Sequence, residues 1–97
     1  MPAKYNWTRE SLSRVAPRAG LYTIYGYVPG HRMYHGKSND LRRRLLEHYR
    51  SDDIGFFPAY VVVTYVANWM ERARREEERI VRDEPTYNIR YKRRSPW

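Results

Sequence analysis

The spacing of apolar residues predicts three β-strands. Residues 21–27 alternate between apolar and polar types and are rich in tyrosine, which is typical of a strand. A turn over residues 28–31 and a returning strand over residues 33–35 follow, so we expect a β-hairpin. Residues 59–67 contain a nearly continuous apolar run, which predicts a buried central strand.

Capping residues and helical periodicity predict two short helices around the hairpin. The first begins at Thr8, which can cap it, and ends near Val15. The second can be capped by Ser38 or Asn39. At ~100° per residue, one face of this helix carries the apolar residues Leu41, Leu45 and Tyr49. A loop over residues 51–58 leads to the third strand.

A third and longer helix follows that strand. Asn68 can cap this helix and Pro85 stops it, so it runs to about Asp83. Residues 87–91 follow as a short extended segment. The order helix, hairpin, helix, strand, helix indicates an α+β protein in which helices pack on a sheet. The chain of 97 residues makes a single domain.

The charge balance points to a nucleic-acid partner. Nineteen basic residues, sixteen of them arginine, oppose eleven acidic ones, and the net charge is +8. Ten tyrosines and three tryptophans accompany them. Arginine matches the geometry of phosphate oxygens, and a basic surface with interleaved aromatic residues favours nucleic acid over a membrane. The alternative is a basic domain whose charge serves only solubility.

The residue types that the chain lacks narrow its chemistry further. It has no cysteine, which excludes disulfides and zinc–thiolate sites, so a metal would need oxygen or histidine ligands. No stretch reaches the ~18 apolar residues that span a membrane. The first residues also lack the apolar run of a signal peptide. We therefore expect a cytoplasmic protein with no membrane partner.

Two tyrosines on the predicted hairpin are candidates for activating a water. Hydrolysis of a phosphodiester needs an activated water and neutralised charge on the phosphate and the leaving oxygen. Tyr22 and Tyr34 lie on the two hairpin strands, and a neighbour such as Lys37 could make a phenolate accessible. Alternatively, both are ordinary tyrosines of an amphipathic strand.

The second predicted helix carries candidate phosphate ligands. Arg44 and His48 lie one turn apart on the rim of its apolar face and can point into a cleft, whereas Arg43 and Glu47 point away. Arg44 would clamp the scissile phosphate, and His48 would bond a phosphate oxygen or the attacking water. Alternatively, a solvated basic helix contacts only backbone phosphates.

Three consecutive glutamates in the third helix, residues 76–78, are candidates for a metal ligand. Mg²⁺ prefers one or two carboxylates together with waters and phosphate oxygens. Glu77 falls within a sparse apolar stripe with Met70, Ala73 and Val81, whereas Glu76 lies at its edge. Surface ion pairs with the neighbouring arginines are the alternative.

These residues resemble, in order and spacing, the motifs of the GIY-YIG endonucleases. Gly20-Leu21-Tyr22 corresponds to the first motif and Tyr34-His35-Gly36 to the second. The family's arginine lies eight residues after that last glycine, at Arg44, and the histidine of many members lies twelve after it, at His48. The resemblance covers residues 19–92.

The C-terminal half carries the rest of the resemblance. The family's metal glutamate precedes an isoleucine by four residues, which selects Glu76 before Ile80. Its closing asparagine corresponds to Asn88. Residues 36–44 are similar to the small stand-alone members and to the nuclease part of UvrC-like repair proteins. His35 departs from the pattern, because the family has an aliphatic strand residue there.

The resemblance implies a small three-stranded antiparallel sheet flanked by helices. Outside the part that it covers, we expect residues 1–18 to form a helical extension and residues 93–97 a basic tail. It also implies one divalent metal, Mg²⁺ or Mn²⁺, held by Glu76, and one-step hydrolysis through a tyrosine-activated water. We favour Tyr22 as the base and Tyr34 as the residue that orients the water.

The sequence therefore predicts a metal-dependent DNA endonuclease of the kind used in DNA repair. The expected catalytic residues are Tyr22, Tyr34, Lys37, Arg44, His48, Glu76 and Asn88. The expected nucleic-acid contacts are Arg42, Arg43, Arg44, Arg90 and Lys92. A non-catalytic nucleic-acid-binding module and a small basic structural partner are the alternatives, and RNA is an alternative substrate. We expect a monomer or a weak homodimer. One active site makes one cut, so cleavage of both strands would need a dimer or two encounters.

Overall fold

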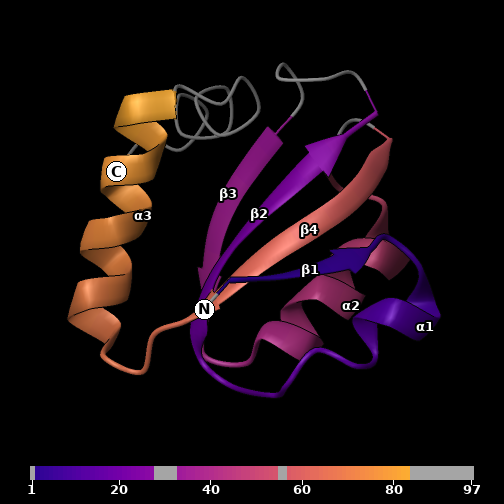
Figure 1. Cartoon of the computed structure of the whole chain (residues 1–97), viewed down its shortest axis with the longest axis horizontal. Helices are drawn as coiled ribbons and strands as arrows, with labels where there is room; N and C mark the ends of the chain where they lie inside the picture. The colour runs from indigo at the N-terminus through magenta and orange to yellow at the C-terminus, as the bar shows by residue number, and fades with distance from the viewer. Residues whose placement is uncertain (1, 28–32, 55–56, 84–97) are drawn as a thin grey trace.

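The computed structural model of the chain describes residues 2–27, 33–54 and 57–83. A four-stranded antiparallel sheet lies at its centre (Figure 1). In the order in which they pair, its strands are β1 (Ala3–Asn6), β4 (Pro58–Tyr65), β2 (Gly20–Gly26) and β3 (Met33–Ser38). The α+β class and the antiparallel pairing of β2 with β3 are confirmed. The sheet has four strands, one more than the three that were predicted.

Strand β1 is the strand that the sequence analysis missed. It pairs with β4 in a register that joins Ala3 to Val63 and Asn6 to Tyr60. The N-terminal segment is therefore part of the sheet, and not only a helical extension. Four residues are too few to show a period of two, and the strand forms because it satisfies the backbone groups along one side of β4.

Three helices accompany the sheet, as predicted. They are α1 (Arg9–Leu12), α2 (Leu41–Ser51) and α3 (Trp69–Asp83). Helix α1 ends before the predicted Val15, because the chain tightens into turns in which the Arg14 N–H donates to a carbonyl three residues earlier at 3.0 Å. No helix in the described ranges combines the length and apolar character needed to cross a membrane.

The helix caps are partly those predicted. Thr8 caps α1 and Asn68 caps α3, each by accepting a hydrogen bond from a backbone N–H of the first turn. The cap of α2 is Asp40, whose carboxylate accepts from a first-turn N–H at 3.1 Å, and not Ser38 or Asn39. Ser38 instead donates from Oγ to the Asp40 carbonyl at 2.9 Å and shapes the turn before the helix.

One face of the sheet packs against α1 and α2 and forms the hydrophobic core. Its buried members are Leu12, Val15, Tyr22, Ile24, Leu41, Leu45, Ile54, Val61 and Val63. Leu41 and Leu45 are therefore buried as predicted. Tyr49, on the same face of α2, lies at the margin of the core, with its ring centroid 6.3 Å from that of Trp7.

Strand β4 is central, as predicted, but it is buried mainly on one face. Val61 and Val63 point into the core, whereas Val62 and Thr64 point to the opposite face and are half-buried. Helix α3 contacts β3 and β2, and Figure 1 shows it beside β3 and away from β4. Helix α3 therefore does not cover the second face of β4, although the apolar run continues there. The prediction that β4 is buried on both faces was wrong.

The buried face of α3 also differs from the predicted stripe. Ile80 and Arg72 are buried, whereas Met70 and Val81 are exposed. Arg72 can be buried because its guanidinium donates to two backbone carbonyls after β4, at 2.9 and 2.6 Å. The predicted turn over 28–31 and everything predicted from residue 84 onward lie outside the described residues.

Candidate active site

Tyr22 lies in β2 and is only 1% exposed, on the core face of the sheet. Its partner across the strands is Gly36 of β3, which is an edge strand. A Cβ atom at position 36 would overlap the ring and the hydroxyl of Tyr22, so the ring lies across this glycine. The glycine of the second motif is therefore what lets the phenol extend over β3.

A chain of two hydrogen bonds links Tyr22 to the end of α2. The Tyr22 hydroxyl lies 2.8 Å from His48 Nε2, and His48 Nδ1 lies 2.7 Å from a carboxylate oxygen of Asp53. An ionised carboxylate only accepts, so Nδ1 carries the imidazole proton and Nε2 accepts from the Tyr22 hydroxyl. We call these three residues the Asp53–His48–Tyr22 chain.

Asp53 is the site residue that the sequence analysis missed. It follows Asp52, the C-cap of α2, whose left-handed conformation (φ 53°) turns the backbone away from the helix path. The turn brings the Asp53 carboxylate back beside His48. The sequence signal is weak, because two aspartates after a helix lie where helical periodicity no longer predicts the direction of a side chain.

Tyr34 joins the same cluster of rings. Its ring centroid lies 6.3 Å from that of Tyr22 and 5.6 Å from that of His48. The tyrosines of the two motifs therefore share one face of the sheet. His35 points to the opposite face, where it is buried and its Nδ1 lies 2.7 Å from Thr23 Oγ1, so it belongs to the packing between sheet and helix.

The three arginines at the start of α2 have different environments. Arg44 is 38% exposed and its charge acts on the Tyr22 phenol. Arg43 is 61% exposed and points to solvent, as predicted. Arg42 donates from Nε to the backbone carbonyl of Val15 at 2.7 Å. Arg42 is therefore engaged within the fold, although the sequence analysis placed it among the nucleic-acid contacts.

Glu76 approaches the site from α3. Its carboxylate accepts from Lys37 Nζ of β3 at 2.8 Å, and its side chain is only 16% exposed. Lys37 points to the opposite face of β3 from Tyr34, and its partner is this carboxylate rather than a phenol. Glu77 is exposed. Of these two glutamates, Glu76 is therefore the one on the face of α3 that is turned toward the sheet, whereas the predicted apolar stripe had contained Glu77.

The site perturbs two of its titratable groups. Burial raises the pKa of the Tyr22 phenol far above its usual range, Tyr34 and Glu76 reinforce the rise, and Arg44 opposes it. Burial also lowers the pKa of His48, against the hydrogen bond and charge of Asp53. At neutral pH the phenol therefore keeps its proton, and the imidazole is neutral and able to accept one.

The side chains of the site could bind a metal ion in only one way among the described residues, through a single carboxylate. Within residues 2–27, 33–54 and 57–83, no three His, Asp or Glu side chains are grouped so that they could hold a metal by themselves. A hard divalent cation also binds through one carboxylate, with waters and substrate phosphates completing its shell. Glu76, turned toward the sheet beside Lys37, fits that single-carboxylate role for Mg²⁺ or Mn²⁺.

Three of the predicted site residues, Asn88, Arg90 and Lys92, lie outside the described part of the chain. Comparison of the chain with protein-family models, with curated proteins and with solved structures finds no match. The assignment of a function therefore rests on the residues of the chain and on the geometry of the site.

The first prediction concerns the titration of His48. We expect its pKa below 6.5, and lower still in Asp53→Asn, because the variant loses the charge that opposes burial. An unfolded chain would then bind a proton that the folded chain does not. The contribution of neutral His48 to the free energy of unfolding is therefore fully present above the pKa of ~6.5 that His48 has in the unfolded chain. This contribution is lost as the pH falls from there toward the pKa of His48 in the folded chain.

NMR titration of the imidazole protons measures this directly, with the His48 signal identified by its loss in His48→Asn. Melting temperatures across the same pH range give the stability. A His48 that titrates above 6.5, or that is unaffected by Asp53→Asn, would contradict the described hydrogen bonding.

Proposed function

We propose that this chain is a metal-dependent DNA endonuclease of the GIY-YIG type. The observation that carries the proposal is that one edge of the sheet gathers a buried phenol, its imidazole acceptor, an arginine and a carboxylate. They are Tyr22, His48, Arg44 and Glu76, and they come from three different elements. A domain that only binds phosphates gains nothing from burying polar groups in this way, because their desolvation is costly.

The Asp53–His48–Tyr22 chain supplies a route for the proton of the attacking water. As the water oxygen bonds to phosphorus, Tyr22 takes a water proton and passes its own proton to His48 Nε2. The phenol is never left charged, so its raised pKa is no obstacle. Asp53 stabilises the imidazolium that results. The bond from phosphorus to the leaving oxygen breaks, and that oxygen takes a proton from solvent.

Arg44 and Glu76 act on the charge of the phosphate. Arg44 lies beside the phenol and is partly exposed, so its guanidinium can meet the phosphate that the water attacks. A divalent metal bound at Glu76 would stabilise negative charge on the phosphate and the leaving oxygen. Lys37 keeps the Glu76 carboxylate turned toward the sheet.

The exposed basic residues supply affinity for DNA that does not depend on sequence. Exposed arginines on α2 and α3 include Arg43, Arg50, Arg74 and Arg82. We propose that the protein acts in the cytoplasm as a monomer or a weak homodimer, making one cut at each encounter.

A non-catalytic DNA-binding module is the second candidate. The ion pair between Lys37 and Glu76 favours it, because a carboxylate that is already paired is less available to a metal. Both candidates lose affinity for DNA as salt increases, so binding measurements do not separate them. Turnover does.

Incubation with labelled single-stranded, duplex and branched DNA, and with RNA, in Mg²⁺, Mn²⁺ or EDTA tests the proposal. We expect cleavage of DNA with either metal and none in EDTA. Binding without cleavage under every condition would reject the endonuclease and support the binding module.

The second prediction compares two neighbouring arginines. Arg44→Ala should reduce the cleavage rate about 10²–10³-fold, because it removes a group that neutralises transition-state charge. Affinity for DNA should change little, since the other basic residues remain. Arg43→Ala, on the solvent side of the same helix, is the matched control and should stay near the wild-type rate. Equal losses in the two variants would contradict the assigned direction of Arg44.

The third prediction compares two neighbouring glutamates. Glu76→Gln preserves shape and removes the charge that a metal needs, so Mg²⁺-dependent cleavage should fall about a hundredfold or more. Glu77→Gln should cleave normally, because Glu77 is exposed. Isothermal titration with Mn²⁺ in the presence of DNA gives metal binding beside the rates. A fully active Glu76→Gln with an inactive Glu77→Gln would reverse the assignment.

A further inference from the structure

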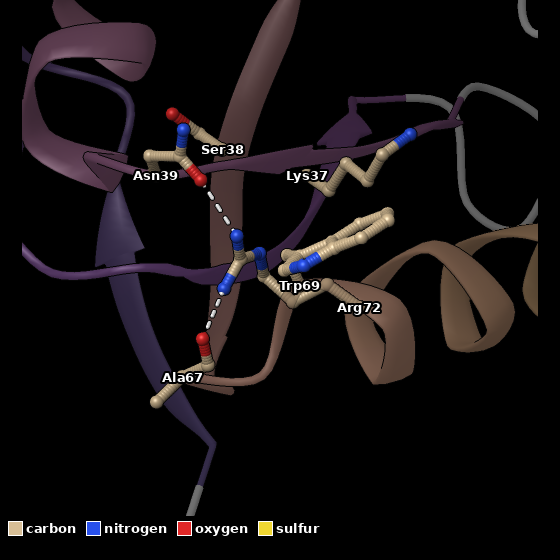
Figure 2. A pocket seen from close by; sticks show the side chains of 6 residues that line it. All are labelled: Lys37, Ser38, Asn39, Ala67, Trp69 and Arg72. Atoms are coloured by element: carbon tan, nitrogen blue, oxygen red, sulfur yellow. Dashed lines mark hydrogen bonds between the residues drawn. The ribbon is translucent and has the colours of Figure 1, made fainter.

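A pocket of about 640 Å³ opens where the end of β3 meets the start of α3 (Figure 2). It is lined by Lys37, Ser38, Asn39, Ala67, Trp69 and Arg72. Figure 2 shows Ser38 and Asn39 on one side, Trp69 and Lys37 on the other, and Arg72 between them. We call it the Trp69 pocket. Its volume lies within the range of small-molecule sites, ~300–1,000 Å³, which is large enough for a nucleobase.

Trp69 gives this pocket an aromatic wall. Trp69 is 67% exposed, although aromatic side chains of this size usually bury a large apolar surface. It is the first residue of α3, and the Asn68 cap fixes the helix at that point, with 2.9 Å between Asn68 Oδ1 and a first-turn N–H. A bare indole on a fixed backbone is a flat surface on which any nucleobase can stack.

Arg72 gives the pocket a fixed positive charge. Its guanidinium donates to the carbonyls of Val66 and Ala67 and, at 2.6 Å, to Asn39 Oδ1. All three acceptors are neutral, and no carboxylate within residues 2–27, 33–54 and 57–83 pairs with it. A buried cation that neutral groups hold in place keeps its field, which favours an anionic ligand. An aromatic wall beside a positive charge suits a nucleotide.

Lys37 joins the Trp69 pocket to the candidate active site. It lines the pocket and also pairs with Glu76 at 2.8 Å. Glu76 lies one helical turn after Arg72, so both side chains point to the same side of α3. A DNA strand with a phosphate at Glu76 therefore brings a neighbouring base to the mouth of the pocket.

We infer that the Trp69 pocket receives one unstacked base of the DNA strand beside the phosphate to be cut. This inference rests on the proposed function and specifies its substrate class, which is DNA with unpaired nucleotides, in single strands or branches. A base in an intact duplex would first have to leave its stack, which costs free energy that an unpaired base does not lose.

Fluorescence anisotropy of labelled oligothymidylate and of a blunt duplex, measured in EDTA, tests the inference. Trp69→Ala should weaken binding of the single strand about tenfold, since stacking contributes that much per base. Trp69→Phe should retain most of the affinity because it keeps an aromatic face. Met70→Ala is the matched control, as Met70 is equally exposed but does not line the pocket. Duplex binding should be the same in all four proteins.

Two results would overturn the inference: equal single-strand affinities of wild type and Trp69→Ala, or an equal loss for the duplex. Circular dichroism shows whether each variant is folded. If Trp69→Ala is not, Trp69→Leu decides the matter, because it keeps an apolar side chain but has no aromatic face and should lose single-strand affinity to a similar extent. Because EDTA prevents turnover, the two proposals fail separately. A Trp69-dependent affinity without metal-dependent cleavage supports the pocket and rejects the endonuclease. Cleavage without a Trp69-dependent affinity supports the endonuclease and rejects the pocket.

Discussion

A phenol buried on the core face of a sheet must be hydrogen-bonded, and the arrangement of the candidate site follows from how Tyr22 meets that requirement. Its ring crosses Gly36, where any larger residue would overlap it. Its hydroxyl donates to His48 of α2, and the turn that ends α2 brings Asp53 back to the same imidazole. Removing one member leaves a buried polar group without its partner, which costs about 1–3 kcal/mol.

The same interaction connects stability with the proposed chemistry. Burial holds the proton on Tyr22 and keeps His48 neutral, which are the two conditions for moving a proton from phenol to imidazole. The phenol extends over the edge strand β3. Glu76 of α3 reaches the same strand by pairing with Lys37. Lys37 lines the Trp69 pocket and also contacts Glu76 at this edge. The proposed cleavage site and the proposed base-binding site would therefore be adjacent.

Local rules predicted much of the fold and of the site, because the features concerned depend on neighbours a few residues apart. The caps Thr8 and Asn68 and the inward direction of His48 are of this kind. Features that depend on distant partners were missed. Strand β1 forms only through its pairing with β4, which is its neighbour in the sheet but lies far along the sequence, as in the pair Ala3 and Val63. The packing face of α3 depends on carbonyls that accept from Arg72, and no period in the sequence reveals them.

The proposed mechanism depends on the Tyr22 hydroxyl, which would pass the proton of the attacking water on to His48. Tyr22→Phe removes that one oxygen and keeps the ring over Gly36, so single-turnover cleavage of a labelled branched DNA in Mg²⁺ measures what the hydroxyl contributes. We expect the cleavage rate to fall at least about a hundredfold, with unchanged affinity for the DNA. A Tyr22→Phe protein that cleaves within a few-fold of the wild-type rate would contradict it.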